Sequence, residues 1–251
     1  MMKKILKSLL SLLFWLAVWL LLSAAVGSPL LLPRPDRVLL RLAELACTGR
    51  FWGTVGLTLL RILCGILAGT LLGLVLAVLT SRFSLLNTLF SPLLTVIKAT
   101  PVASFIVLIL LWVGREILPA VIVVLMVLPV VWANVSAGIA GVDRKLLELA
   151  DVYGFSRRRR LKRIYLPSVL PHFVAALRSA LGMAWKAGVA AEVLTVPAVS
   201  IGRQLTDARL YLEIPDLFAW TLVVILCSLA VEKLLIAGVA RLSGRKGGGK
   251  A

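Results

Sequence analysis

The chain has 251 residues, of which 61% are hydrophobic and only 16% are charged, and its mean hydropathy is +1.03. Soluble domains are about 45–50% apolar and about 25% charged, so this composition excludes an ordinary soluble domain. The formal net charge is nevertheless +17. A hydrophobic chain with a cationic excess is typical of a multi-span helical membrane protein with basic cytoplasmic loops. Its long charge-free runs argue against nucleic-acid binding.

Six charge-poor segments predict an all-α integral membrane protein with about six transmembrane helices. The first is the charge-free run from Ser8 to Pro33, which as a helix would reach about 39 Å and exceed a hydrocarbon core of about 30 Å. A secretory signal peptide would also fit this segment, but the rest of the chain is itself membrane-like, which favours an uncleaved span. The other helices are expected near 56–80, 88–112, 117–140, 169–194 and 216–239.

The distribution of Lys and Arg predicts that both termini are cytoplasmic. With the N-terminus inside, sixteen basic residues lie in inside segments and seven in outside segments, in agreement with the positive-inside rule. Segment 27–55 is unusually basic for an external loop. We divide the chain into 1–55, the first helix and external loop; 56–240, a five-helix core with a cytoplasmic loop at 141–168; and 241–251, a basic flexible cytoplasmic tail.

Small residues recur every four positions on two of the expected helices. They are Gly65, Gly69, Gly73 and Ala77 on one, and Ala176, Ala180, Ala184 and Gly188 on the other. Stripes of small residues allow helix backbones to approach closely in a membrane. We expect both stripes to pack within the chain rather than to form a subunit interface.

No residue set in the chain predicts a catalytic or metal site. The three cysteines lack CxxC spacing and are expected to be small buried apolar residues, and the only histidine, His172, cannot build a multi-His site. Residues 244–250 fit the phosphate-loop pattern G-x4-G-K, but Ala251 occupies the position of its Ser or Thr. No strand precedes this segment, so we expect no ATP binding here.

The loop between the fourth and fifth spans has the pattern of a helix, a glycine and a second helix. One apolar face is formed by Leu146, Leu149, Ala150 and Tyr153, at i, i+3, i+4 and i+7. Asp143 can cap the first helix and Gly154 can end it, while Ser156 can cap a turn that holds Arg157–Arg160. We expect Pro167 and Pro171 to break the helical pattern before the next span. Binding of anionic headgroups would explain the arginines but not the apolar face.

Residues of this loop resemble the EAA loop of ABC importer permeases, E-A-A-x3-G-x9-I-x-L-P. The matching positions are Glu148-Leu149-Ala150, Gly154 and Ile164-Tyr165-Leu166-Pro167, with Leu149 in place of the first alanine. Three further segments, 98–104, 184–193 and 216–219, resemble the nitrate/sulfonate/taurine (NitT/TauT) branch of these permeases. The resemblance implies a type I importer (MetI-like) architecture.

This resemblance implies a permease subunit, not an enzyme, in a bacterial inner membrane. Its partners would be a cytoplasmic ABC ATPase dimer, an external solute-binding protein and a second permease copy, which we expect to be identical. ATP and magnesium would bind in the ATPase, and no cofactor would bind in this chain. The substrate would be a small anionic solute such as a sulfonate or nitrate. A vitamin or vitamin precursor is the alternative within the family; a channel or scaffold not coupled to ATP is the alternative class.

The resemblance also assigns roles to residues of the loop. Glu148, Ala150 and Gly154 would form the docking core for the ATPase, and Leu146, Leu149 and Tyr153 the buried face. Ile164, Leu166 and Pro167 would tie the loop to the fifth span.

Polar residues within spans are candidates for the translocation path. They are Lys98, Thr100, Ser104, Asn134, Lys186 and Glu192. The two lysines could attract an anion; alternatively they pair with Glu192, Glu232 or backbone carbonyls, and we favour this structural role. We also expect Pro101 and Pro129 to kink the third and fourth spans.

Overall fold

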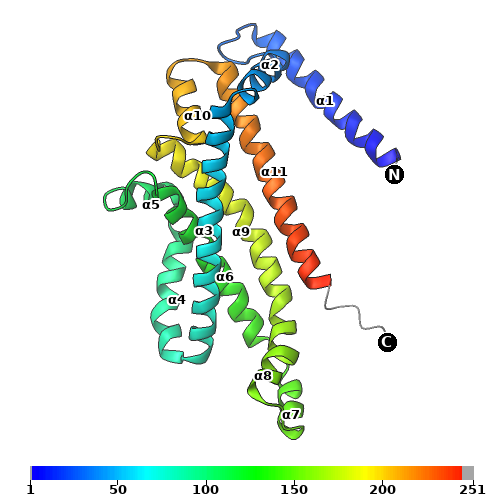
Figure 1. Ribbon diagram of the computed structural model, residues 1–251, viewed down its shortest axis with the longest axis vertical. Coiled ribbons are helices and arrows are strands. Elements are labelled where there is room, and N and C mark those ends of the chain that lie inside the picture. Colours follow the sequence, from blue (N-terminus) through cyan, green and yellow to red (C-terminus); the bar gives the residue numbers. More distant parts are fainter. Residues whose placement is uncertain (1, 245–251) are drawn as a thin grey trace.

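A computed structural model describes residues 2–244, and within this range the chain forms helices and no strand (Figure 1). This confirms the predicted all-α fold. The long helices are α1 (Met2–Val26), α3 (Gly49–Arg82), α6 (Leu118–Ala140), α9 (Leu166–Thr195) and α11 (Ile214–Gly244). Each belongs to a helical segment long and apolar enough to cross a membrane, and the bent pair α4 (Ser84–Ala99) and α5 (Val102–Ile109) would make a sixth span. The predicted tail 241–251 is helical to Gly244 and otherwise lies outside the described residues.

The third span differs from the single helix predicted near 88–112. Helix α4 ends at Ala99, α5 begins at Val102, and the two are bent by 106°. Thr100 is extended, with φ −79° and ψ 131°, because a following proline disfavours the helical conformation. Pro101 therefore breaks this span rather than kinking it, whereas Pro129 lies inside the uninterrupted helix α6.

The fifth span begins earlier than predicted, and its prolines do not break it. Helix α8 (Arg157–Arg160), a π-helical turn η1 (Leu161–Tyr165) and α9 follow one another without interruption. The backbone N–H of Leu166 donates to the carbonyl of Leu161, five residues back. Since Pro167 cannot donate to a carbonyl four residues back and its ring crowds that carbonyl, the wider π turn lets the helix continue.

Two short helices, not predicted from the sequence, lie at the end of the bundle opposite to α7 and α8 (Figure 1). They are α2 (Pro35–Ala46) and α10 (Ile201–Leu210). Arg41 of α2 forms a two-pronged ion pair with Asp216 of α11, with 3.0 Å between Nη2 and Oδ2. These hydrogen bonds to Asp216 raise the pKa of Arg41 above its ordinary value, so the guanidinium stays charged.

Helix α6 packs between α3 and α9 through the predicted stripes of small residues. A Cβ at Gly65 of α3 would lie 2.7 Å from the backbone oxygen of Ala120 and from Cβ of Val123, both on α6. One at Gly188 of α9 would lie 3.0 Å from Val123 and 2.8 Å from Ile62 of α3. Ala176, Ala180 and Ala184 are buried in the same core. The expectation that both stripes pack within the chain is confirmed.

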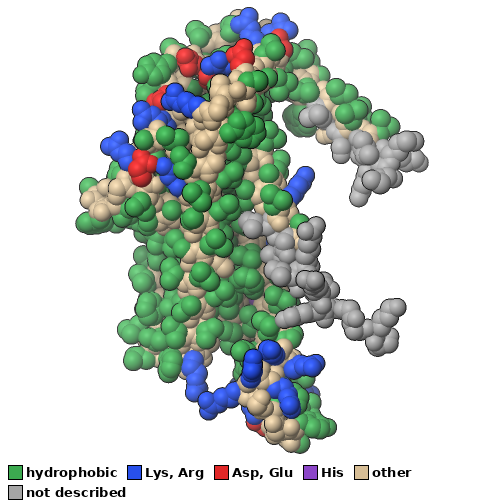
Figure 2. All heavy atoms as spheres, viewed as in Figure 1, with side chains coloured by type: hydrophobic (Ala, Val, Ile, Leu, Met, Phe, Trp, Pro, Cys, Tyr) green, Lys and Arg blue, Asp and Glu red, His purple; other side chains and the backbone are tan. Residues whose placement is uncertain are grey.

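The outer surface is that of a membrane-spanning protein. Figure 2 shows hydrophobic side chains over most of the middle of the molecule and charged side chains gathered at its two ends. Cys47 and Cys64 are exposed, contrary to the prediction that all three cysteines are buried. An apolar side chain on a spanning helix need not be covered by protein, because lipid can cover it.

Candidate coupling and translocation residues

The predicted helix–glycine–helix in the loop is present. Helix α7 (Arg144–Val152) begins at Asp143, whose side chain accepts a hydrogen bond of 2.9 Å from the N–H of Lys145. It ends at Gly154, whose φ of +60° strains any residue with a Cβ. The N–H groups of Phe155 and Gly154 donate to the carbonyls of Ala150 and Asp151, at 2.8 and 3.1 Å, which makes a Schellman motif.

A small apolar cluster joins α7 to η1, and an ion pair joins α7 to α8. Ala150 is only 2% exposed and packs with Val142 and Ile164, which are also buried. The side chain of Arg160 pairs with Asp151 and donates to the carbonyl of Phe155 at 3.2 Å. The hydroxyl of Ser156 caps α8 by accepting from the N–H of Arg159. Helices α7 and α8 therefore form one rigid unit at the end of the bundle (Figure 1).

The outward face of α7 differs from the predicted one. Leu146, Leu149 and Tyr153 were expected to be buried, but within this chain they are exposed, Tyr153 to 73%. Ala150 turns inward instead, because it packs against Ile164 of its own chain. Val152, which the sequence analysis missed, is 82% exposed beside them. Glu148 and Gly154 are exposed on α7 or at its end, and Leu166 and Pro167 are exposed at the start of α9.

The two lysines of the spans do not have the structural partners that we favoured. Lys98, in the last turn of α4, and Lys186, on α9, are exposed. Within residues 2–244 the structure gives neither of them an ion pair or a side-chain hydrogen bond. Glu192, one of the expected partners, pairs with Arg61 instead.

The remaining path candidates lie on three neighbouring helical segments. Thr100, in the break after α4, and Asn134 of α6 each donate to a backbone carbonyl four residues back, at 2.8 Å. Ser104 is exposed on α5, and α5 packs against α9 through Ile106 and Ala187. The break between α4 and α5 therefore lies close to the part of α9 that carries Lys186.

Glu192 is fully buried and is not a lining residue. Its carboxylate accepts hydrogen bonds from the Thr58 hydroxyl at 3.0 Å and the Gly202 N–H at 3.2 Å, and from Arg61 at 3.4 Å. A Cβ at position 202 would lie 2.3 Å from the backbone of Glu192, so only glycine permits this approach. The assignment of Glu192 to the translocation path is wrong for this arrangement.

Arg61 was missed by the sequence analysis, although a charge within an apolar helix is itself a signal. Its guanidinium also donates to the carbonyl of Val199 at 2.7 Å and pairs with Glu116, between α5 and α6. Glu116 in turn accepts from the N–H of Ala198 at 2.6 Å. We call Thr58, Arg61, Glu192 and Gly202 the buried polar cluster, which the exposed Glu116 joins at its edge. It holds α3, α9, α10 and the intervening loop together.

The chain thus forms a bundle of helices long enough to span a membrane, with a rigid helical projection at one end. Residues 69–246 match the family described as binding-protein-dependent transport system inner membrane component. The chain belongs to this family and is an inner-membrane permease subunit of an ABC importer.

Similar permeases carry names that concern sulfonates and a pyrimidine. The chain is 29% identical to a Bacillus subtilis protein provisionally named aliphatic sulfonates transport permease SsuC, covering 92% of this chain and 82% of that one. It is 25% identical to the taurine transport system permease TauC of Escherichia coli, over 90% and 84% of the two chains. It is 29% identical to the formylaminopyrimidine transport permease ThiX of Halalkalibacterium halodurans, over 67% and 68%. The resemblance to the sulfonate and taurine branch is confirmed.

A solved structure has the same fold. It is a bacterial ABC transporter involved in the import of the acidic polysaccharide alginate, with a TM-score of 0.62 and 16% sequence identity, and the match covers 98% of this chain and 96% of that one. The predicted importer-permease architecture is therefore confirmed.

Proposed function

We propose that this permease forms the translocation path of its importer and couples that path to a separate cytoplasmic ATPase through α7 and α8. The observation that carries the proposal is the exposed apolar face of α7, formed by Leu149, Val152 and Tyr153. Large apolar side chains gathered on a rigid projection are typical of a protein-binding surface. We place the α7 end of the bundle on the cytoplasmic side, which agrees with the side that the distribution of Lys and Arg predicts for this loop and for both termini.

A single helical segment connects the docking surface to the membrane bundle. Residues 157–195 form one helical segment of 39 residues, about 58 Å long at 1.5 Å per residue. When ATP closes the two ATPase subunits, a displacement of α7 would be passed along this segment to the opposite end of the bundle. Alternation between inward-facing and outward-facing states requires such a rigid connection.

The lysines support an anionic substrate. A lysine at the centre of a bilayer costs about 2.5–3.5 kcal/mol, and neither Lys98 nor Lys186 is compensated by an acidic partner among the described residues. This cost favours a position facing water, in a path shared with a second permease copy. With Thr100 and Ser104 nearby in sequence, the lining would attract a small sulfonate delivered by an external binding protein. The relative named for formylaminopyrimidine supports a vitamin precursor as the second candidate, and uptake of labelled taurine against labelled pyrimidine would distinguish them.

The coupling role is tested by placing a charge on the outward face of α7. We expect Tyr153→Asp to reduce the amount of ATPase that co-purifies with the tagged permease in mild detergent by about tenfold or more, since a buried interface tyrosine contributes about 2 kcal/mol. The matched control is Tyr211→Asp, because Tyr211 is 75% exposed at the opposite end of the bundle, against 73% for Tyr153. Equal recovery of the ATPase with both variants would contradict the proposal.

A further inference from the structure

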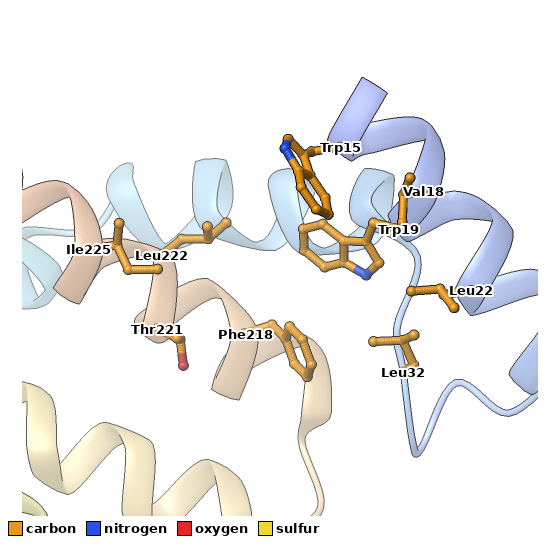
Figure 3. Close-up of a pocket in the computed structure, with 9 residues that line it drawn as sticks. All are labelled: Trp15, Val18, Trp19, Leu22, Leu32, Phe218, Thr221, Leu222 and Ile225. Carbon is orange, nitrogen blue, oxygen red and sulfur yellow. The ribbon is translucent and has the colours of Figure 1, made fainter. Parts of the chain in front are cut away.

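Two adjoining cavities lie where α1 meets α11, at the end of the bundle that carries α2 and α10. The first is a groove of about 410 Å³ between these two helices (Figure 3). It is lined almost entirely by apolar side chains: Trp15, Val18, Trp19 and Leu22 of α1, Leu32 of the following loop, and Phe218, Thr221, Leu222 and Ile225 of α11. It lies between two helices that contain segments long and apolar enough to span a membrane.

The second cavity has two arginines in its wall. It has a volume of about 200 Å³ and is lined by Ser23, Gly27, Ser28, Pro29, Leu32, Arg34 and Arg37. Leu32 lines both cavities, so the arginine-lined pocket lies next to the apolar groove. Arg34 is paired with Asp36 at 3.1 Å, whereas Arg37 has no ion pair among residues 2–244. The pocket therefore keeps an uncompensated positive charge.

Specific contacts hold these walls in place. The indole N–H of Trp19 donates to the carbonyl of Pro33 at 3.1 Å, and the hydroxyl of Ser23 donates to that of Leu32 at 3.0 Å. The rings of Trp19 and Phe218 lie 5.9 Å apart across the groove (Figure 3). The loop after α1 is thus folded back onto the helix, which keeps the arginine pocket next to the groove.

We propose that the two cavities together bind one anionic phospholipid of the outer leaflet, with its phosphate at Arg37 and Arg34 and an acyl chain in the groove. From Phe218 to Ile225 the groove extends roughly 10 Å along the helix axis, which matches the upper part of an acyl chain. A partner helix would fill the apolar groove but would leave the cationic pocket without a counter-charge.

The proposal also accounts for a feature that the transport function leaves unexplained. The segment 27–55 carries four arginines although our orientation places it outside, where the positive-inside rule disfavours basic residues. A phosphate bound at Arg34 and Arg37 would neutralise part of this excess. The inference does not depend on the coupling role or on the substrate.

The experiment is native mass spectrometry of the permease purified with its importer complex and exchanged into vesicles of phosphatidylglycerol and phosphatidylethanolamine. We expect retention of phosphatidylglycerol over phosphatidylethanolamine. Arg37→Gln should weaken this retention about fivefold, since one basic residue near a membrane surface contributes about 1 kcal/mol. Leu222→Trp, which fills the groove, should reduce retention of both lipids. The matched control is Arg50→Gln, which removes the same charge from the same segment outside both cavities and should leave retention unchanged.

Two results would overturn the proposal. One is equal loss of lipid with Arg37→Gln and Arg50→Gln, which would mean that only the overall charge matters. The other is a cross-link from a photoreactive group at Leu222 to a second permease copy rather than to lipid, which would show that protein occupies the groove.

Discussion

The two ends of the bundle use their side chains in opposite ways. At the α10 end, the charged groups of the buried polar cluster find their partners within the chain, and Glu192 alone accepts three hydrogen bonds. At the α7 end the helix is equally well held, but it keeps Val152 and Tyr153 exposed. The buried polar cluster is satisfied within a single chain, whereas the apolar face of α7 is a surface that a partner would complete. Mutations in the buried polar cluster are therefore expected to lower the stability of the protein, and mutations on the exposed face of α7 to impair coupling.

The largest expected effect is at Glu192. Glu192→Gln replaces one acceptor oxygen by an NH2 donor in a buried site where the carboxylate accepts from Thr58, Arg61 and Gly202. Each lost hydrogen bond to a charged group costs about 1.5–3 kcal/mol. The melting temperature of the purified permease should fall strongly. Glu213→Gln, an exposed glutamate at the same end, should leave it unchanged. Equal melting temperatures for the two variants would show that the buried polar cluster does not stabilise this end.

An intermediate effect is expected between α3 and α6. Gly65→Ala would place a Cβ 2.7 Å from the backbone oxygen of Ala120, so the two helices must separate, at a cost of about 1–3 kcal/mol. Gly56→Ala is the matched control on the same helix, because a Cβ there meets no atom within 4 Å. The thermal stability of both variants is measured from the loss of the monodisperse peak in size-exclusion chromatography after heating. A Gly65→Ala variant as stable as Gly56→Ala would contradict the close packing of these helices.

A change at Gly154 is expected to have the smallest effect on stability, but it should reduce transport. Gly154→Ala forces a Cβ onto a φ of +60°, which costs about 1–2 kcal/mol and loosens only the end of α7. Substrate uptake by the complete importer should fall, while membrane insertion and the melting temperature of the bundle stay unchanged. Gly182→Ala, on α9 where a Cβ meets nothing within 4 Å, should transport normally. Normal transport by Gly154→Ala would show that the turn at Gly154 is not required for coupling.

The sequence predicted local features better than the partners of distant residues. The caps at Asp143 and Ser156, the turn at Gly154 and the small-residue stripes follow from spacing alone, and the structure contains them all. The pairing of Arg61 with Glu192 joins residues 131 positions apart, and no local pattern indicates it. Periodicity identified the apolar stripe of α7, but it could not show that Ala150 turns inward while Tyr153 turns outward.

Some of the missed elements had local signals. Helix α2 begins with Pro35 and places Val38, Leu42 and Leu45 on one face, which is the pattern of an amphipathic helix. The break at Thr100 follows from the proline after it. The continuation through Pro167 had no such signal, because a π turn depends on how the helix is held on both sides.

The π turn η1 sets the rotational phase between the docking surface and the membrane bundle. A π turn contains one residue more than the α-helix it interrupts, and each residue of an α-helix advances the direction of its side chains by about 100°. In an otherwise unchanged helix, loss of one residue between Leu161 and Tyr165 would swing α7 by about a quarter of a revolution around the axis of α9. The exposed face of α7 would then point away from its present direction. The direction in which the docking surface faces thus depends on a single inserted residue. The side chains that form this surface all lie outside the turn.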